Sequence, residues 1–452
     1  MENENRNETK NKNKFWKGVL VGALVTAFAG LMIVGVAAGI SVIGRSVIDS
    51  QVQQQGTVAE STGAAAENQK LDLLSLNKKL STLQDIINRD FLFDEDMSKV
   101  EDGIYKGLMY GLDDPYSVYY TAEEYAQMSE ETSGVYCGIG AMISQNIETG
   151  IMTAIRVFPG SPAEEAGMKK GDIFYKVDGQ DVSQFDLDVL VQQHVRGEEG
   201  TYVDLTVLRD GEEVSLHVQR RMVENPTVEH QMMEDKTGYV LVTQFDVITG
   251  DQFQTAVEDL EKQGMERLVI DLRDNPGGVV DSCVQMAAYL LPEDPFDGML
   301  LSTASKHGQE DKYYCEDGEL RHETAEGKRL EKRYPKTDDH ELDMPIAVLL
   351  NGQSASASEV FAGALQDYKK AVLVGTTSFG KGIVQNLIPL TDGSAVKLTV
   401  AHYYTPAGND LHKKGLTPDV EVEYEVPENP GQDMAEILKQ DNQVQAAIEA
   451  IK

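Results

Sequence analysis

From Gly238 onward, the chain alternates between short apolar runs typical of buried strands and longer stretches whose apolar residues recur at helical spacing. Such alternation favours an α/β layer, because a helix that connects two strands lies on a face of the sheet they share. A polar and charged insertion at 293–343 interrupts the pattern. Strands are expected at 239–245, 268–272, 346–350, 371–374 and 395–404, and helices at 253–263, 279–291, 359–368 and 433–451.

The segment 351–360 stands where the strand expected at 346–350 meets the next helix, and it is the stretch best suited to chemistry. Its small residues let backbone approach a ligand closely, and a helix N-terminus offers free N–H groups. These residues alone leave two interpretations open. Ser356 and Glu359 fit a capping box, in which the serine caps the helix and the glutamate reaches back to it. Alternatively, a serine of this segment is a nucleophile.

Lys381 lies between two glycines in an otherwise apolar context, which is a poor place for a solvated surface charge. A serine attacks an acyl carbon only when a base takes its proton, and a lysine accepts that proton only while it is neutral. Burial lowers the pKa of a lysine because it disfavours the charged form. Lys381 therefore favours the second interpretation, a nucleophilic serine paired with a lysine base.

A Ser–His–Asp enzyme and a cysteine nucleophile are the rival chemistries. His402 and His412 fall in the same half of the chain as Ser356, but we find no Gly-x-Ser-x-Gly elbow in the sequence. Cys283 sits in an apolar helical run, where packing in the core is the expected role. The three cysteines include no Cys-x-x-Cys pair, so the sequence predicts neither a metal site nor a disulfide framework.

Four motifs resemble those of the C-terminal processing (tail-specific) peptidases, a family of membrane-associated or exported serine proteases with a Ser–Lys dyad. Their order and spacing match over residues 70–450. One departure is Gln353, where many members have glycine. The motifs are Ser-Ala-Ser-Ala-Ser-Glu at 354–359, Phe-Gly-Lys-Gly at 379–382 followed by Gln385, Asp-Leu-Arg-Asp-Asn-Pro-Gly-Gly at 271–278, and Gly-Ser-Pro-Ala-Glu-Glu-Ala-Gly at 160–167.

This resemblance implies a catalytic role at each matching position. Ser356, the middle serine of its motif, is the expected nucleophile, and Lys381 is its general base. Ser354 and Ser358 are expected to be turn and cap residues. Gln385 is expected to hydrogen-bond the lysine amine and orient it.

The resemblance also selects two backbone N–H groups as the oxyanion hole, those of Gly278 and Ala357. A tetrahedral intermediate needs donors aimed at its oxyanion, and each is worth about 3–4 kcal/mol when removed. A tight turn is the alternative role of Pro276-Gly-Gly278. No cofactor and no metal are implied.

Residues 134–222 look like a PDZ domain, with glycine-containing motifs at 138–140, 160–167 and 171–179. Such a domain captures a peptide C-terminus as an added strand, and backbone N–H groups of a glycine turn hold the carboxylate. Strands at 202–208 and 213–218 are expected to close the domain as a hairpin. The expected peptide-binding residues are Gly138, Ile139, Gly140 and Arg196, the last because some family members use an arginine there; a solvated turn arginine is the alternative.

The N-terminal part predicts a membrane anchor. Residues 1–17 form a polar tail with basic residues, and no residue from 18 to 44 is charged. A bilayer core needs about 20 apolar residues as helix, so the second segment is expected to be an uncleaved, single-pass transmembrane helix. The basic flank should stay cytoplasmic, which places the catalytic part outside the cytoplasm. Residues 45–69 read as a linker.

The net charge of this 452-residue chain limits the classes of partner that it is expected to bind. Forty basic and 75 acidic residues give a net charge of −35. Such a charge repels nucleic acid, so a phosphate-binding role is disfavoured. Helical patterning at 70–133 predicts helix packing or contact in a homo-oligomer.

The leading functional prediction is a membrane-anchored serine endopeptidase that cleaves extracytoplasmic proteins selected by their C-terminal tails. A catalytically silent, membrane-anchored PDZ scaffold is the alternative, although a scaffold has no reason to keep both Ser356 and Lys381 in frame. The predicted fold is an α/β protease core with an inserted β-rich PDZ domain, an N-terminal helical region and one transmembrane helix. The core is expected at 223–426, followed by a C-terminal helix at 427–452.

Overall fold

The computed structural model describes residues 70–94, 96–292, 296–316, 319–324, 327, 329–333, 342–427 and 433–452. The chain divides into two compact units, Met1–Asp94 and Glu95–Lys452. The predicted tail, membrane span and linker, 1–69, lie outside the described residues. Among the residues that are described, no helix has both the length and the apolar character needed to cross a bilayer.

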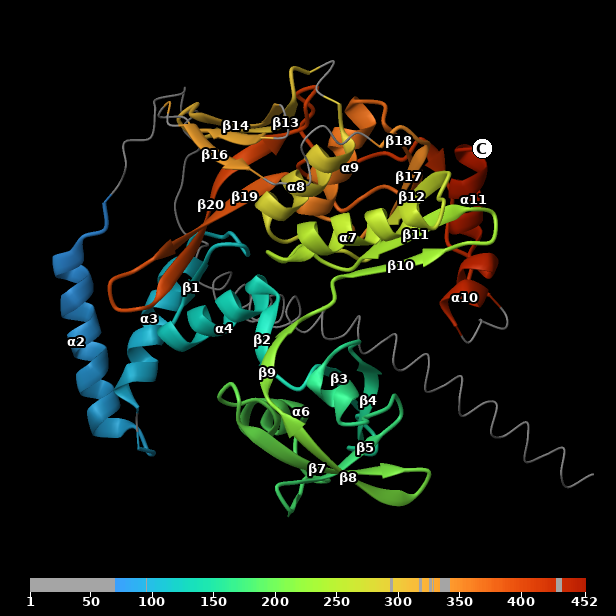
Figure 1. Ribbon diagram of the computed structural model, residues 1–452. Helices are drawn as coiled ribbons and strands as arrows, with labels where there is room; N and C mark the ends of the chain where they lie inside the picture. Colours follow the sequence, from blue (N-terminus) through green and yellow to red (C-terminus); the bar gives the residue numbers. More distant parts are fainter. Residues whose placement is uncertain are drawn as a thin grey trace, which may run out of the picture. The chain divides into compact units, whose positions relative to one another are not determined.

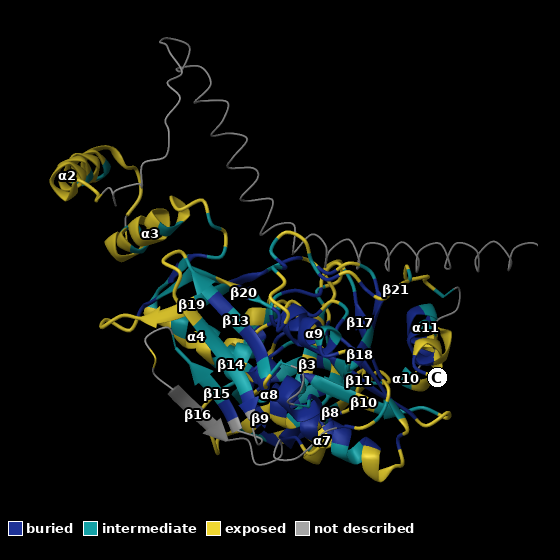
Figure 2. Cartoon of the chain, turned by 90° about the horizontal axis from the view of Figure 1, so that it is seen from above, coloured by how far each residue is buried: buried dark blue, intermediate teal, exposed yellow. Residues whose placement is uncertain are grey.

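In the first unit, the described part is essentially one helix, α2 (Leu73–Asp90). The Asp72 carboxylate begins it by accepting hydrogen bonds from the N–H groups of Leu74 and Ser75, which have no partner inside the helix. None of its residues is buried, and Figure 2 shows it in the colour of exposed residues almost throughout.

The centre of the second unit is a six-stranded sheet that is parallel except for β10 at one edge. The parallel α/β layer predicted from the alternating pattern is present. The strand predicted at 239–245 ends early, at Val242, because Phe245 leaves the sheet and pairs with Gly278 instead. In sheet order the strands are β10 (Val228–Met232), β11 (Thr237–Val242), β12 (Arg267–Asp271), β17 (Ile346–Leu350), β18 (Ala371–Gly375) and β21 (Val420–Glu421).

Helices cover both faces of this sheet, which is why β17 is apolar at every position (Figure 1). Ile346, Val348 and Leu350 belong to the larger core cluster, shared with α7, α8 and α9. Ala347 and Leu349 point the other way, into the cluster shared with α11. The covering helices are α7 (Thr249–Lys262), α8 (Val280–Leu290), α9 (Ala357–Asp367) and α11 (Asn442–Ala450).

The C-terminal segment is two helices, which corrects the single helix predicted at 427–452. Helix α10 (Met434–Gln440) ends at Asp441, and α11 begins directly after it. The Asp441 carboxylate accepts from the N–H groups of Gln443 and Val444 and also forms an ion pair with Arg273 at 2.9 Å. This buried aspartate therefore breaks the helix and attaches α11 to the loop after β12.

A second, antiparallel sheet runs β1-β20-β13-β14-β15-β16, and β19 pairs with Ala395–His402 along the other edge of β20. Most of its strands come from the insertion at 293–343, for which the sequence analysis predicted no regular structure. The strands are β1 (Val118–Tyr120), β13 (Met299–Ser305), β14 (Glu310–Glu316), β15 (Glu319–Glu323), β16 (Arg329–Arg333), β19 (Ile383–Pro389) and β20 (Ala395–Tyr404).

The region predicted to be a PDZ domain folds around its own apolar core, a six-stranded sheet with β3 at one end of the strand order. The predicted hairpin is present as β7 and β8. The pair β2 (Val135–Gly138) and β9 (Arg221–Glu224) leads into and out of it. Its elements are β3 (Ala141–Gln145), β4 (Met152–Val157), α5 (Pro162–Glu165), β5 (Ile173–Val177), β6 (Gln180–Asp181), α6 (Leu187–Val189), the π-helix η1 (Leu190–Val195), β7 (Tyr202–Arg209) and β8 (Glu212–Gln219).

Two helices precede this region, α3 (Met97–Tyr110) and α4 (Ala122–Ser133). Thr121 and Glu124 form a complete capping box at the start of α4. Gly134 ends the helix in a left-handed conformation, with φ +73°, before the chain enters β2.

Candidate active site

Three loops that follow parallel strands meet at one edge of the central sheet. The loop after β12 carries Pro276-Gly-Gly278, the loop after β17 carries Ser356, and the loop after β18 carries Lys381. Because the carboxyl ends of neighbouring parallel strands lie side by side, residues far apart in sequence converge there. A cavity of about 340 Å³ is lined by all three loops.

Ser356 occupies a strained turn immediately before α9. Its φ of 56° and ψ of −116° are rarely adopted by a residue with a side chain. The side chain lines the cavity, whereas Ser354 and Ser358 are fully buried. Ser354 Oγ donates to the Leu272 carbonyl at 2.8 Å, and Ser358 Oγ donates to the Asn275 carbonyl at 3.0 Å. The two outer serines therefore hold the loop, and the middle one faces the cavity.

Glu359 joins the serine loop to the lysine loop. Its carboxylate is fully buried and accepts the Ser356 N–H at 2.9 Å, as the capping box predicted. The same carboxylate accepts the N–H groups of Gly380 at 2.7 Å and Lys381 at 2.8 Å, and the Ser378 hydroxyl at 2.5 Å. Hydrogen bonds to a carboxylate are stronger than neutral ones, so one side chain fixes the spacing of both loops.

Lys381 lines the same cavity as Ser356 and is half-buried. Burial lowers the pKa of Lys381, and repulsion from Lys397 lowers it further; Asp114 and Glu359 oppose the shift. The amine lies 4.5 Å from the centroid of the Tyr116 ring. Within the described residues, no hydrogen bond joins this amine to Ser356, so the two side chains share one cavity without being hydrogen-bonded to each other.

Gln385 also lines the cavity, but its predicted contact with Lys381 is not formed in this structure. Its amide nitrogen donates to Thr399 Oγ1 at 3.4 Å and to the Ile383 carbonyl at 3.5 Å. The register of β19 against β20 shifts between Val384 and Gln385, and Gln385 lies opposite Thr399, the residue to which it donates.

Two free N–H groups border the cavity, those of Gly278 and Ala357. Neither has an acceptor among the described residues, as an oxyanion hole requires. Glycine is needed beside them: a Cβ on Gly277 would lie 2.6 Å from the Ala355 carbonyl oxygen, and one on Gly278 would lie 2.0 Å from that of Phe245. The loop after β12 thus packs against the serine loop backbone to backbone.

The rival nucleophiles and bases lie away from this cavity. The rings of His402 and His412 pack together with centroids 5.1 Å apart, and neither lines the cavity around Ser356. Cys283 is fully buried in the core, where burial raises the pKa of its thiol. A buried thiol with a raised pKa is a poor nucleophile.

Family comparisons agree with this geometry. Residues 236–422 match the model of peptidase family S41, residues 155–209 match a PDZ domain, and residues 32–124 match the N-terminal domain of the activating protease CtpB. The chain belongs to peptidase family S41. The family predicted from the four motifs is thereby confirmed.

Named relatives of this S41 chain include a probable CtpA-like serine protease of Staphylococcus aureus (strain MSSA476), 34% identical over 356 residues. A second, from Staphylococcus epidermidis (strain RP62A), is 34% identical over 350 residues. The alignment covers 78% of this chain and 66% of the Staphylococcus aureus protein, just under two thirds of its length. Among solved structures, a photosystem II D1 C-terminal processing protease is 30% identical, with 79% of this chain and 89% of the other covered and a TM-score of 0.41.

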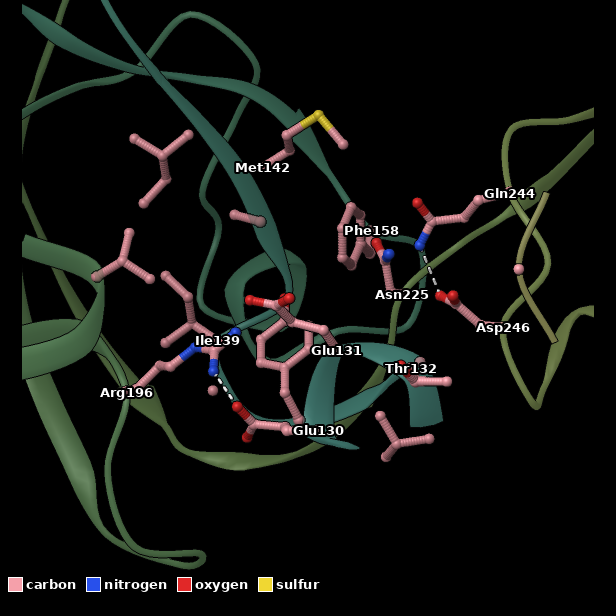
Figure 3. A pocket seen from close by; sticks show the side chains of 18 of the residues that line it. Glu130, Glu131, Thr132, Ile139, Met142, Phe158, Arg196, Asn225, Gln244 and Asp246 are labelled. Carbon is pink, nitrogen blue, oxygen red and sulfur yellow. Dashed lines mark hydrogen bonds and ion pairs between the residues drawn. The ribbon is translucent and has the colours of Figure 1, made fainter. Parts of the chain in front are cut away.

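The PDZ domain of this S41 chain borders a second cleft, of about 550 Å³ (Figure 3). Gly138, Ile139 and the first residues of β3 line it, together with Arg196. Neither Ile139 nor Gly140 has an acceptor for its N–H among the described residues. These groups lie beside the outer edge of β3, which pairs on its other side with β4.

Arg196 forms part of the wall of this cleft and is not the solvated residue of the alternative interpretation. Its guanidinium forms an ion pair with Glu130 of α4 and lies 4.8 Å from the centroid of the Tyr136 ring. Figure 3 shows the arginine and Glu130 pointing toward one another and joined by a dashed line. The arginine thus links the PDZ domain to the helix that precedes it.

The two cavities share one wall, Pro276-Gly-Gly278. On the PDZ side, the buried carboxylate of Asp246 lies near this loop and accepts a hydrogen bond from Gln244 at 2.8 Å. Sequence reasoning did not find Asp246, Tyr116, Lys397 or the second role of Glu359. Of these four residues, only Glu359 could have been found from the sequence, because it occupies the last position of a capping box.

Proposed function

We propose that this chain is a serine endopeptidase in which Ser356 attacks the scissile carbonyl and Lys381 is the general base. The observation that carries the proposal is the single cavity lined by Ser356, Lys381 and the loop that bears the Gly278 N–H. The names of the Staphylococcus relatives support a serine protease.

The proposed first step transfers the Ser356 proton to neutral Lys381 while Oγ bonds to the carbonyl carbon. The carbonyl oxygen becomes an oxyanion, held by the N–H groups of Gly278 and Ala357. Lys381 then returns its proton to the leaving amine, which gives an acyl-enzyme that water hydrolyses. Before the first proton transfer, the lysine amine must leave the Tyr116 ring and move toward Ser356.

The decisive experiment measures cleavage of unfolded casein by the full chain. Ser356→Ala should abolish turnover and leave the melting temperature unchanged. Ser354→Ala and Ser358→Ala should instead lower stability, since each removes a buried hydrogen bond worth about 1 kcal/mol. If Ser356→Ala kept near-normal turnover, the assignment of Ser356 as the nucleophile would be wrong. If the wild-type chain itself showed no turnover, the catalytically silent PDZ scaffold would be the remaining functional hypothesis.

The lysine role is tested by Lys381→Arg, which should be inactive because arginine stays protonated at any workable pH. Wild-type activity should fall on acidification, since protonation of Lys381 removes the base. The lowered pKa of Lys381 moves this loss toward lower pH than an ordinary lysine would give. Substantial activity of Lys381→Arg would contradict the dyad.

We further propose that substrates are selected by their C-terminal tails, bound as an added strand along β3 with the carboxylate at the N–H groups of Ile139 and Gly140. Amidating the C-terminus of a peptide substrate should then reduce kcat/KM. Arg196→Ala should weaken that dependence without altering the chemistry at Ser356, because it removes the link to Glu130. Equal rates for free-acid and amidated peptides below saturation would end this part of the proposal.

Membrane anchoring through 18–44, with the catalytic part outside the cytoplasm, is also part of the proposal. It is supported by the uncharged segment and its basic flank. Fractionation of cells that express the full chain should place it with membranes through alkaline washing, and externally added proteinase should digest the catalytic part in cells with a permeabilised wall. Recovery in the washed supernatant would contradict the anchor.

A further inference from the structure

The catalytic cavity contains a second lysine, Lys397, to which the proposed mechanism assigns no role. Lys397 lies in β20, where it is opposite Leu387 of β19 and Val118 of β1. Its side chain lines the cavity together with Ser356 and Lys381. A paired strand on each side holds its backbone in place, so the side chain starts from a fixed point on the cavity wall.

Lys397 has no counter-ion in the part of the chain that the structure describes. Its side chain is half-buried, and burial is the cause that lowers its pKa, with no carboxylate acting on it. The carboxylates that act on Lys381 are engaged elsewhere. Asp114 accepts from the Ser117 hydroxyl at 2.5 Å and the Tyr116 N–H at 3.1 Å, and Glu359 holds the two loops. An unpaired, partly buried cation is unfavourable for folding.

We propose that Lys397 is a positioning residue of the active site, whose ammonium charge keeps Lys381 in the neutral form that accepts the proton of Ser356. The inference rests on the proposed Ser–Lys mechanism. A second cation beside a lysine is one of the two ways in which a lysine amine is made available as a base or nucleophile, and burial in an apolar pocket is the other. In this cavity, a second cation and burial both act on Lys381.

The charged groups around Lys381 act in opposite directions. Asp114, from the segment before β1, and Glu359, from α9, favour its protonated form, and the Tyr116 ring does the same by a cation–π contact. Burial and Lys397 favour the neutral form. Repulsion from Lys397 adds to burial in lowering the pKa of Lys381, whereas burial is the cause that lowers the pKa of Lys397.

The test compares the pH dependence of kcat/KM for wild type, Lys397→Gln and Lys397→Arg, each as the full chain acting on one quenched peptide. Lys397→Gln removes repulsion, so the pKa of Lys381 should rise and the acid limb should move to higher pH by roughly half a unit to one unit. At alkaline pH its rate should approach that of wild type. Lys397→Arg keeps the charge and should keep the wild-type profile.

Lys262→Gln on α7 is the matched control, since it removes the same charge at an exposed site and should leave the profile in place. A uniform loss of rate in Lys397→Gln without a shifted limb would overturn the proposal and indicate a structural role. A rise in KM confined to peptides with an acidic residue near the cleavage site, again without a shift, would overturn it too, because Lys397 would then be a substrate-binding residue.

A second measurement separates this proposal from the proposed activity. In the inactive Ser356→Ala background, NMR of lysines labelled with ¹³C at Cε follows the titration of Lys381, whose signal is assigned by its loss in Lys381→Arg. Lys397→Gln should raise the titration midpoint of Lys381 whether or not the wild-type chain cleaves peptides. An unchanged midpoint would refute the role of Lys397 while leaving the endopeptidase proposal intact.

Discussion

At the scale of single residues, the candidate active site is built around a carboxylate that does no chemistry. Glu359 accepts hydrogen bonds from backbone groups on both sides of the cavity, Ser356 N–H on one and Gly380 and Lys381 N–H on the other. Because the carboxylate is fully buried, water cannot take its place as the acceptor for these N–H groups. The distance between the proposed nucleophile, Ser356, and the proposed base, Lys381, therefore depends on one side chain.

Glu359→Gln should inactivate the enzyme and destabilise it by at least about 2 kcal/mol, since an amide cannot accept from all of these donors and leaves some unsatisfied. Glu124→Gln is the matched control: it makes the same change in the capping box of α4, where the side chain is much more exposed. The control should cost less than about 1 kcal/mol. Equal losses of stability in urea denaturation would contradict the linking role of Glu359.

The residues that line the cavity, Ser356 and Lys381, could be picked out from sequence, because motif and spacing identify them. The actual orientation of Lys381 could not, because it depends on Tyr116, which arrives from a segment far away in the chain. The same holds for Gln385, whose side chain donates to Thr399 of the neighbouring strand β20. Local patterns carry no information about either contact.

At the scale of elements, the site exists because β12, β17 and β18 are parallel neighbours. The sequence predicted these strands well, since each is a short apolar run. It missed β14 to β16, whose residues are largely polar and carry no clear apolar period. It also missed the break at Asp441, because the helical pattern on both sides continues across a residue whose ion-pair partner is distant in sequence.

Gly277 offers a test at this scale. Gly277→Ala should reduce kcat at least about tenfold, because a displaced loop moves the neighbouring oxyanion donor and one such donor is worth 10²–10³ in rate. Gly171→Ala is the matched control, with φ of +96° against +95° at Gly277 but with open space around the added methyl group. Both variants carry the same backbone strain, so a difference in kcat reports the contact with the serine loop. Equal activity of the two would contradict that contact.

At the scale of the whole molecule, helix α2 presents apolar side chains that none of the described residues of its own unit, 70–94, covers. Leu73, Leu76, Leu80, Leu83 and Ile87 alternate at intervals of three and four residues, the spacing of a coiled-coil seam. Most of these side chains are exposed. An uncovered seam of this kind favours contact with a second copy of the chain.

We predict that the full chain in detergent has a protein mass of more than one copy by light scattering. Leu76→Glu together with Leu83→Glu should reduce the mass to one copy, because two buried charges would oppose the seam. Lys78→Glu, on the opposite face of the same helix, introduces a comparable charge and should leave the mass unchanged. A monomeric wild type, or dissociation by Lys78→Glu, would contradict the seam.

The backbone contacts of Gly277 and Gly278 bear on how this enzyme could change over evolution. These glycines meet the serine loop and Phe245 mainly through main-chain atoms, and Ser356 Cβ is the one side-chain atom among the nearest neighbours. The position of the proposed oxyanion donors is consequently insulated from replacements in most of the surrounding side chains. Other residues that line either cavity, apart from these glycines and the proposed catalytic residues, are then free to drift and alter the preferred substrate, while the glycines that separate the cavities tolerate almost no replacement.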